Sequence, residues 1–289
     1  MKPAPFVHHE PKTVAEAVAL LADVAPQDGR ILAGGQSLVP AMALRLARPT
    51  HLVDINRIGG LDRLAVDDEA LSIGACVRHA AFHRPTGEGP LGQLLSTVVR
   101  HIAHYPIRTR GTFCGSLANA DPASEWCLVA ATLDTVLVAK STRGTRKIPG
   151  TEFFQGIFTT ALEPDEFLVE ARLPLLSNET RFGFNEFSRR AGDFALAMTL
   201  ATFQLNDGVI AKPRVGNGGV EAAPRRIAEA EAYLAGREPS KEAFRGAADT
   251  AAEAVSPIED SAEAIAYKRD LVRAVTFRAL AQAAALPLI

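Results

Sequence analysis

The stretch ILAGGQSLVPAMALRLARPTHLVDINRI, Ile31 to Ile58, decides how the first part of the chain folds. An apolar run over residues 30–33 enters a Gly-Gly turn, a helical pattern follows over 38–47, and a second apolar run covers 51–55. Two short apolar runs joined through a helix are typical of a βαβ unit, in which the strands are parallel. The paired glycines indicate a tight turn, or a place where another group comes close to the main chain.

The composition is that of a globular chain with a substantial core. Of 289 residues, 47% are hydrophobic and 22% charged, which favours two domains or one domain with a smaller addition. Lys and Arg number 31 against 33 acidic residues, and this balance argues against nucleic acid as a partner. No apolar run approaches the ~18–20 residues of a membrane span. Three cysteines without a close pair favour the cytoplasm and give no disulfide framework.

Further elements follow from the same kind of pattern. Thr13 and Glu16 have capping-box spacing, which predicts the start of a helix. Three antiparallel strands are expected after residue 177, with Asn206-Asp207-Gly208 as a hairpin turn, and the Ala- and Glu-rich end predicts helices. We therefore expect an α+β fold. Its first domain would be residues 1–176, with lobes 1–57 and 58–176, and its second, residues 177–289, would contain a three-stranded antiparallel sheet and a helical bundle.

The first candidate site is the Gly-Gly turn. The amides of Gly34 and Gly35 can form an anion-binding nest, and Gln36 and Ser37 add side-chain donors ahead of a helix N-terminus. The alternative interpretation is a tight turn without a ligand. The chain contains neither a GxGxxG fingerprint after the strand nor a GxxxxGK[ST] loop.

The second candidate site is RTRGTFCGSLANADPASEW, Arg108 to Trp126. Its glycines and hydroxyl side chains suit a loop folded around a diphosphate, although a surface loop leading into a helix is the alternative. Two such loops in two lobes would clamp one long ligand, such as a dinucleotide.

These two segments, and the later FSRRAGDFALA, resemble the flavin-binding medium subunit of molybdenum hydroxylases, the xanthine dehydrogenase and carbon monoxide dehydrogenase group. The resemblance runs through nearly the whole chain. It implies a two-lobed, PCMH-like FAD-binding domain followed by a C-terminal α+β domain. It further implies a heterotrimer in which an iron–sulfur small subunit carries [2Fe–2S] clusters and a molybdenum-binding large subunit carries the molybdenum cofactor. FAD on this chain would pass electrons to an external acceptor.

The resemblance also implies which residues hold FAD. The diphosphate would be wrapped by two segments, Leu32, Ala33, Gly34, Gly35, Gln36, Ser37 and Leu38 from one lobe, and Gly111, Thr112, Cys114, Gly115 and Ser116 from the other. The other contacts would be Ile102 and Ala103 on the apolar wall, Asp121 and Glu125 at the ribityl or ribose hydroxyls, Leu168 and Asn185 near the isoalloxazine edge, and Phe194 near the ring. No catalytic acid, base or nucleophile and no metal ligand is expected on this chain.

Three positions depart from the family pattern. Cys114 stands where glycine is common, which would place a sulfur close to the cofactor. Gln36 replaces a frequent His, and Glu125 stands where Asp is usual.

Two other functions stay open from the sequence. One is a self-standing FAD oxidoreductase with its own substrate, and the other is a nucleotide-binding module without turnover. His79 and His83 have i,i+4 spacing, but no acidic or Cys partner supports a metal site. Trp126 and Cys127 are expected in the core.

Overall fold

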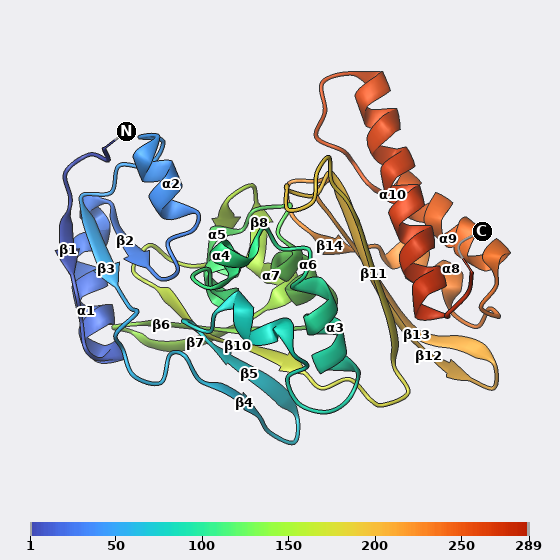
Figure 1. The fold of residues 1–289 in the computed structure, drawn as a ribbon, viewed down its shortest axis with the longest axis horizontal. Coiled ribbons are helices and arrows are strands. Elements are labelled where there is room, and N and C mark those ends of the chain that lie inside the picture. The colour runs from blue at the N-terminus through green and yellow to red at the C-terminus, as the bar shows by residue number, and fades with distance from the viewer. Residues whose placement is uncertain (1, 288–289) are drawn as a thin grey trace.

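The computed structural model describes residues 2–287 and begins with a small parallel sheet (Figure 1). The strands follow the order β1 (Val7–His9), β3 (His51–Asp54), β2 (Gly29–Leu32), and both pairs are parallel, as the βαβ pattern predicted. The helices of this lobe are α1 (Val14–Val24), the short 3₁₀ turn η1 (Ala25–Gln27) and α2 (Leu38–Ala43). The Thr13 hydroxyl accepts a hydrogen bond from the Glu16 amide at 3.1 Å, which confirms the predicted helix start.

Helix α2 is shorter than expected, and β1 was not anticipated. The helix was predicted to reach Ala47 but ends at Ala43, because Arg45 takes a left-handed φ of 60° and the Leu46 amide turns back to the Ala41 carbonyl at 2.9 Å. Strand β1 has three residues, too few for a visible alternation.

The second lobe is built on a five-stranded antiparallel sheet. Its order is β4 (Leu64–Val66), β5 (Ala70–Gly74), β10 (Phe167–Pro174), β6 (Val136–Ser141), β7 (Gly144–Pro149). A two-stranded hairpin consists of β8 (Phe154–Gly156) and β9 (Thr159–Thr160). The helical segments are η2 (His79–His83), α3 (Pro90–Val98), α4 (Tyr105–Arg108), α5 (Phe113–Asn119), α6 (Glu125–Thr132) and α7 (Gly150–Phe153).

The C-terminal region has a four-stranded antiparallel sheet, not the three strands expected. Its order is β11 (Arg181–Phe187), β12 (Ala197–Asn206), β13 (Val209–Gly218), β14 (Arg225–Arg226). The additional strand, β14, has only two residues and leaves no sequence pattern. Asp207 and Gly208 have φ of 50° and 82°, so the predicted hairpin turn is confirmed.

Three helices cover one face of this sheet, and the second lobe covers the other (Figure 1). The helices are α8 (Ala228–Leu234), α9 (Lys241–Ala254) and α10 (Ala262–Ala283). One apolar core runs through both N-terminal lobes and reaches Phe184 and Leu200 of the C-terminal sheet. Another lies between the sheet and the helices around Phe203, Phe244 and Val272. The continuous first core fixes the sheet against α6, beside the candidate site.

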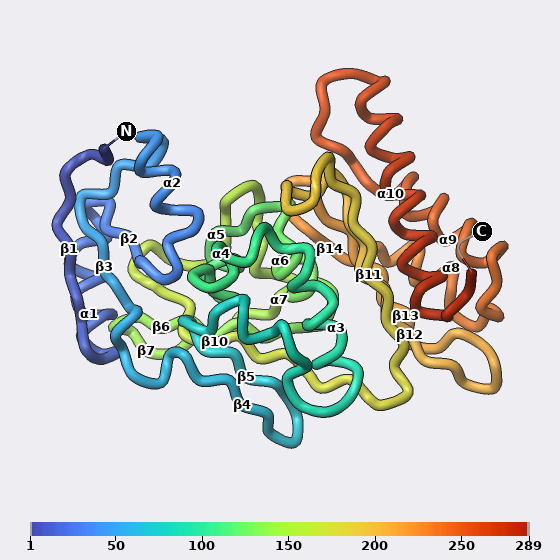
Figure 2. Tube along the Cα trace, in the orientation of Figure 1, coloured from blue at the N-terminus to red at the C-terminus, as the bar shows by residue number. Residues whose placement is uncertain are grey.

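The chain path places the first lobe and the C-terminal helices at opposite ends, with α4, α5 and α6 between them (Figure 2). Within residues 2–287, no helix combines the length and apolarity needed to cross a bilayer.

Candidate cofactor site

A cavity of about 670 Å³ lies among the two N-terminal lobes and the segment that precedes β12. This volume is in the range of small-molecule and cofactor sites. Every residue that the sequence resemblance assigned to FAD lines this cavity, except Asn185. Two segments about 80 residues apart in the sequence therefore face one space.

Gly34 allows the two loops to touch. A methyl group built on Gly34 would lie 2.7 Å from the Gly111 Cα, and the Arg110 carbonyl oxygen would be closer still. The Arg78 guanidinium supports the same junction, because it donates to the Arg110 carbonyl and, at 2.7 Å, to the Asn56 side chain. Glycine is thus required at residue 34 by the backbone of the other loop.

The turn that follows presents a run of free amides. Gly35 has a left-handed φ of 71°, and within residues 2–287 no acceptor is found for the amides of residues 34–38. The Gln36 side-chain amide closes the turn by donating to the Gly34 carbonyl at 3.1 Å. Unpaired amides in a turn that lines a cavity are suited to an anion. Helix α2 has only six residues, so these amides, rather than a long helix dipole, supply the positive potential.

The second segment is not the open loop that the sequence suggested. Residues 113–119 form α5, which Thr112 caps by accepting a hydrogen bond from the Gly115 amide at 3.0 Å. A methyl group on Gly115 would lie 2.5 Å from the Thr112 hydroxyl oxygen and would displace the cap.

Cys114 lines the cavity, but its thiol is directed toward the core. Its side chain is buried, and the thiol donates to the Ile73 carbonyl at 3.5 Å, on the core side of α5. Burial, the largest cause, raises the pKa of this thiol, which keeps it protonated. The replacement of the family's common glycine by Cys114 therefore changes the packing of the core.

Two acidic residues from adjacent turns reach the cavity. Asp121 accepts from the Ala123 amide at 2.9 Å, and burial raises the pKa of its carboxyl. Glu125, the first residue of α6, is 7% exposed. Burial, and then the charge of Glu186, raise the pKa of Glu125 to about 8.

Glu186 was missed by sequence reasoning. It lies in β11 with a side chain only 4% exposed, and burial raises its pKa to about 7. Its Oε2 atom has no hydrogen-bond partner, and the His101 Nδ1 atom lies 3.8 Å away. The only sequence signal is its position two residues after Phe184, on the same face of the strand.

Of the residues expected near the flavin ring, Asn185 lies outside the cavity lining and Phe194 lies within it. Asn185 pairs with Thr199 in the sheet and lies outside the cavity lining, so the expected contact with a ligand is not supported. Phe194 lines the cavity and is 71% exposed. Its loop rests on the first domain, because a methyl group on Gly192 would lie 2.6 Å from the His104 ring.

His79, one of the two histidines weighed as metal ligands, has a structural role. The Trp126 indole donates to the His79 Nδ1 atom at 3.0 Å, and burial lowers the pKa of His79 to about 3. His79 also packs under Gly111, where a methyl group would lie 2.5 Å from its Nε2 atom. Trp126 and Cys127 are fully buried, as expected.

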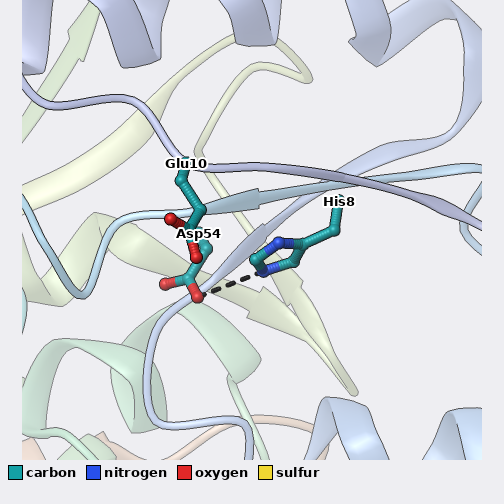
Figure 3. A group of neighbouring side chains, drawn as sticks. All are labelled: His8, Glu10 and Asp54. Atoms are coloured by element: carbon teal, nitrogen blue, oxygen red, sulfur yellow. Dashed lines mark hydrogen bonds and ion pairs between the residues drawn. The ribbon is translucent and has the colours of Figure 1, made fainter.

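A separate surface group joins β1 to β3 (Figure 3). The His8 Nε2 atom lies 3.2 Å from an Asp54 carboxylate oxygen, and Glu10 lies beside them. Arg57 binds Glu10 at 2.9 Å, and Lys12 lies 3.7 Å from it. Because two cationic side chains already neutralise Glu10, we interpret the group as an ion-pair network.

Comparisons with known proteins give the same architecture. Residues 4–176 match the FAD binding domain in molybdopterin dehydrogenase, and residues 182–283 match the CO dehydrogenase flavoprotein C-terminal domain. The nicotine 6-hydroxylase medium subunit of Paenarthrobacter nicotinovorans is 34% identical over 285 residues, covering 99% of both chains. The 6-hydroxypseudooxynicotine dehydrogenase complex subunit alpha of that organism is 36% identical over 98% of this chain and 96% of its own.

A solved structure of carbon monoxide dehydrogenase from Hydrogenophaga pseudoflava aligns with a TM-score of 0.93 at 34% identity, covering 99% of both chains. Fold, cavity and family matches together define an FAD-binding oxidoreductase chain. Within that class, the chain belongs to the family of FAD-binding medium subunits of molybdenum hydroxylases.

The donor set of the cavity fits FAD. The free amides at 34–38 and the Ser116 hydroxyl suit a diphosphate, and the Asp121 carboxyl lines the same space as an acceptor for hydroxyl groups. Ile102 and Leu168 supply apolar lining for a flat ring.

Proposed function

We propose that this chain is the FAD-bearing electron-transfer subunit of a molybdenum-containing hydroxylase or dehydrogenase. Electrons would come from the [2Fe–2S] clusters of an iron–sulfur small subunit and leave to an external acceptor, while a molybdenum-binding large subunit hydroxylates the substrate. The observation that carries this proposal is the single cavity shared by the two glycine-containing loops. Relatives along the full chain are named as medium subunits, which supports a multi-subunit complex.

The number and burial of the cysteines support the placement of the iron–sulfur clusters on another chain. The sequence has only three, and all are buried and free. A [2Fe–2S] cluster usually takes four protein ligands, so the clusters would belong to the partner. Reduced thiols also agree with a cytoplasmic complex.

In this proposal, the chain binds and orients the cofactor. FAD supplies the redox chemistry when bound. The amides of 34–38 and the start of α5 would hold the diphosphate, Asp121 and Glu125 would approach the hydroxyl groups, and Ile102 and Leu168 would form the apolar wall. No side chain has to exchange a proton with the organic substrate. Residues 1–176 would form the FAD-binding domain and residues 177–289 the C-terminal domain.

An apolar rim marks where the partner would dock. Phe158, Phe194 and Ile107 line the cavity and are 62%, 71% and 37% exposed. Exposed apolar groups at a redox site are typical of a protein interface. The interface would be large and partly apolar, as in permanent complexes.

The test is to express the chain alone and together with its neighbouring genes. The chain alone should bind FAD that dithionite reduces, yet show no substrate-dependent dye reduction, whereas the co-expressed complex should show it. Substrate-dependent dye reduction by the chain alone would instead support a self-standing oxidoreductase. A folded chain that takes up no FAD would favour the nucleotide-binding module.

A further inference from the structure

Among residues 2–287, Glu125 and Glu186 are buried carboxyl groups that form no ion pair with a lysine or arginine. Glu125 comes from α6 and Glu186 from β11, one from each side of the domain boundary. Within residues 2–287, Glu125 forms no ion pair, and the nearest cation-forming group to Glu186 is His101, at 3.8 Å. Of the two, only Glu125 lines the cavity, and Glu186 lies close enough for its charge to raise the pKa of Glu125.

Within residues 2–287, no arginine or lysine forms an ion pair with either carboxyl group. From α4, Arg108 donates to the neutral carbonyls of Ile102, Arg100 and Ala103, at 2.5, 2.9 and 2.9 Å, and its charge lowers the pKa of Glu125 by less than burial and the charge of Glu186 raise it. Asp121, in the loop before α6, adds a further negative group.

His101, after α3, is also a poor counter-ion. Its ring packs against Phe184 at 4.9 Å between centroids, and burial followed by the charge of Arg108 lowers its pKa. His101 is therefore neutral at neutral pH. Two ionised carboxylates without counter-ions would be costly in this setting, because both desolvation and mutual repulsion oppose ionisation.

We propose that the Glu125–Glu186 pair retains a proton at neutral pH and that FAD is held tightly only while the pair carries this proton. This inference rests on the proposed function, since it takes FAD as the ligand. A ligand that fills the cavity removes water from Glu125 and brings the negative charge of its diphosphate into the same space, and both effects disfavour a carboxylate. A protonated carboxyl can also donate a hydrogen bond to a ligand oxygen, which a carboxylate cannot do.

The sign of the pH dependence follows. Burial raises the pKa of Glu125 to about 8 and that of Glu186 to about 7, so the ligand-free pair loses its proton as the pH rises through this range. If FAD binds the protonated form better, its Kd stays constant at lower pH. Above this range the Kd rises by up to about tenfold per pH unit for one linked proton.

The experiment is FAD titration of the flavin-free purified chain from pH 6 to 9, followed by flavin fluorescence. The wild type should lose affinity as the pH rises. Glu186→Gln removes the repulsion that raises the pKa of Glu125, so affinity should begin to fall at a lower pH. Glu125→Gln, a neutral isostere of the protonated acid, should flatten the profile. Glu163→Gln is the matched control, because Glu163 lines the same cavity but is exposed, and it should keep the wild-type midpoint.

Three results would overturn the inference. One is a pH-independent Kd for the wild type, and another is an equally steep profile in Glu125→Gln. The third is a loss of affinity in Glu125→Gln even at pH 6, which would assign the ionised carboxylate as a hydroxyl acceptor. A folded wild type that binds no FAD at any pH would be a failure of the proposed function. The retained proton would then still be tested by thermal melts of the ligand-free chain, in which wild type should lose more stability than Glu125→Gln between pH 6 and 9.

Discussion

Replacing Gly34 with alanine should separate the two loops that form the cofactor cavity. The new methyl group would lie 2.7 Å from the Gly111 Cα, whereas ordinary carbon–carbon contact begins at ~3.5 Å. The loops would have to move apart by about 0.8 Å. Both contact groups are backbone atoms of the neighbouring loop, so no side-chain rotation relieves the clash. Overpacking of this kind costs about 1–3 kcal/mol of folding stability.

The assay is flavin absorbance per chain, together with the free energy of unfolding from urea titration. Gly34→Ala should lower both. Gly59→Ala is the matched control, because a methyl group there has nothing within 4 Å, and it should change neither. Gly35→Ala should give flavin content and stability between those of the other two variants. Its left-handed φ of 71° costs about 1–2 kcal/mol, but the atoms nearest to the new methyl group, at 3.1 and 3.3 Å, belong to side chains that can move. A Gly34→Ala chain with the flavin content and stability of Gly59→Ala would refute the loop-contact argument.

Three further changes test other parts of the structure. In the flavin-free chain, Glu125→Gln should be more stable than wild type by about 3–5 kcal/mol at pH 9. The reason is that burial raises the pKa of Glu125 from 4.5 to about 8, so ionisation destabilises the folded state increasingly over this range; equal urea midpoints at pH 9 would contradict it. Cys114→Gly should keep flavin content and dithionite reducibility while losing about 1–2 kcal/mol of stability from the lost buried side chain, and a loss of reducibility would show a redox role. Lys268→Met should lose about 1–3 kcal/mol and speed proteolysis of the loop before β12, because Lys268 Nζ donates to the Leu196 and Gly219 carbonyls at 2.8 and 3.1 Å; unchanged proteolysis would contradict that anchoring role.

Local signals account for the parts of the fold that the sequence predicted. The apolar runs around the Gly-Gly turn become β2 and β3 with the expected parallel pairing, and the Thr13 cap and the Asp207-Gly208 turn lie where their patterns indicated. Each of these features depends on a few neighbouring residues. The composition of the two glycine-containing loops suggested one shared ligand, but the residue-by-residue assignment came from the family resemblance, because spacing along a chain does not fix which loops meet.

The missed features depend on tertiary contacts. Gly34 is constrained by a backbone that lies almost 80 residues away, and nothing near it in the sequence shows this contact. The inward direction of Cys114 follows from the rotation of α5, which was taken for a loop because its first turn contains glycine. Glu186 is buried because the C-terminal sheet packs on the second lobe, and an isolated strand pattern with a charge every few residues reads as half-exposed.

The central claim, that FAD is the redox centre of this chain, is tested most directly by anaerobic dithionite titration of the FAD-saturated, purified chain. The account predicts that the chain takes up only the electrons that one FAD accepts, with bleaching of the flavin band accounting for all of them. Retention of no flavin by a correctly folded chain, or uptake of further electrons by another centre, would contradict it.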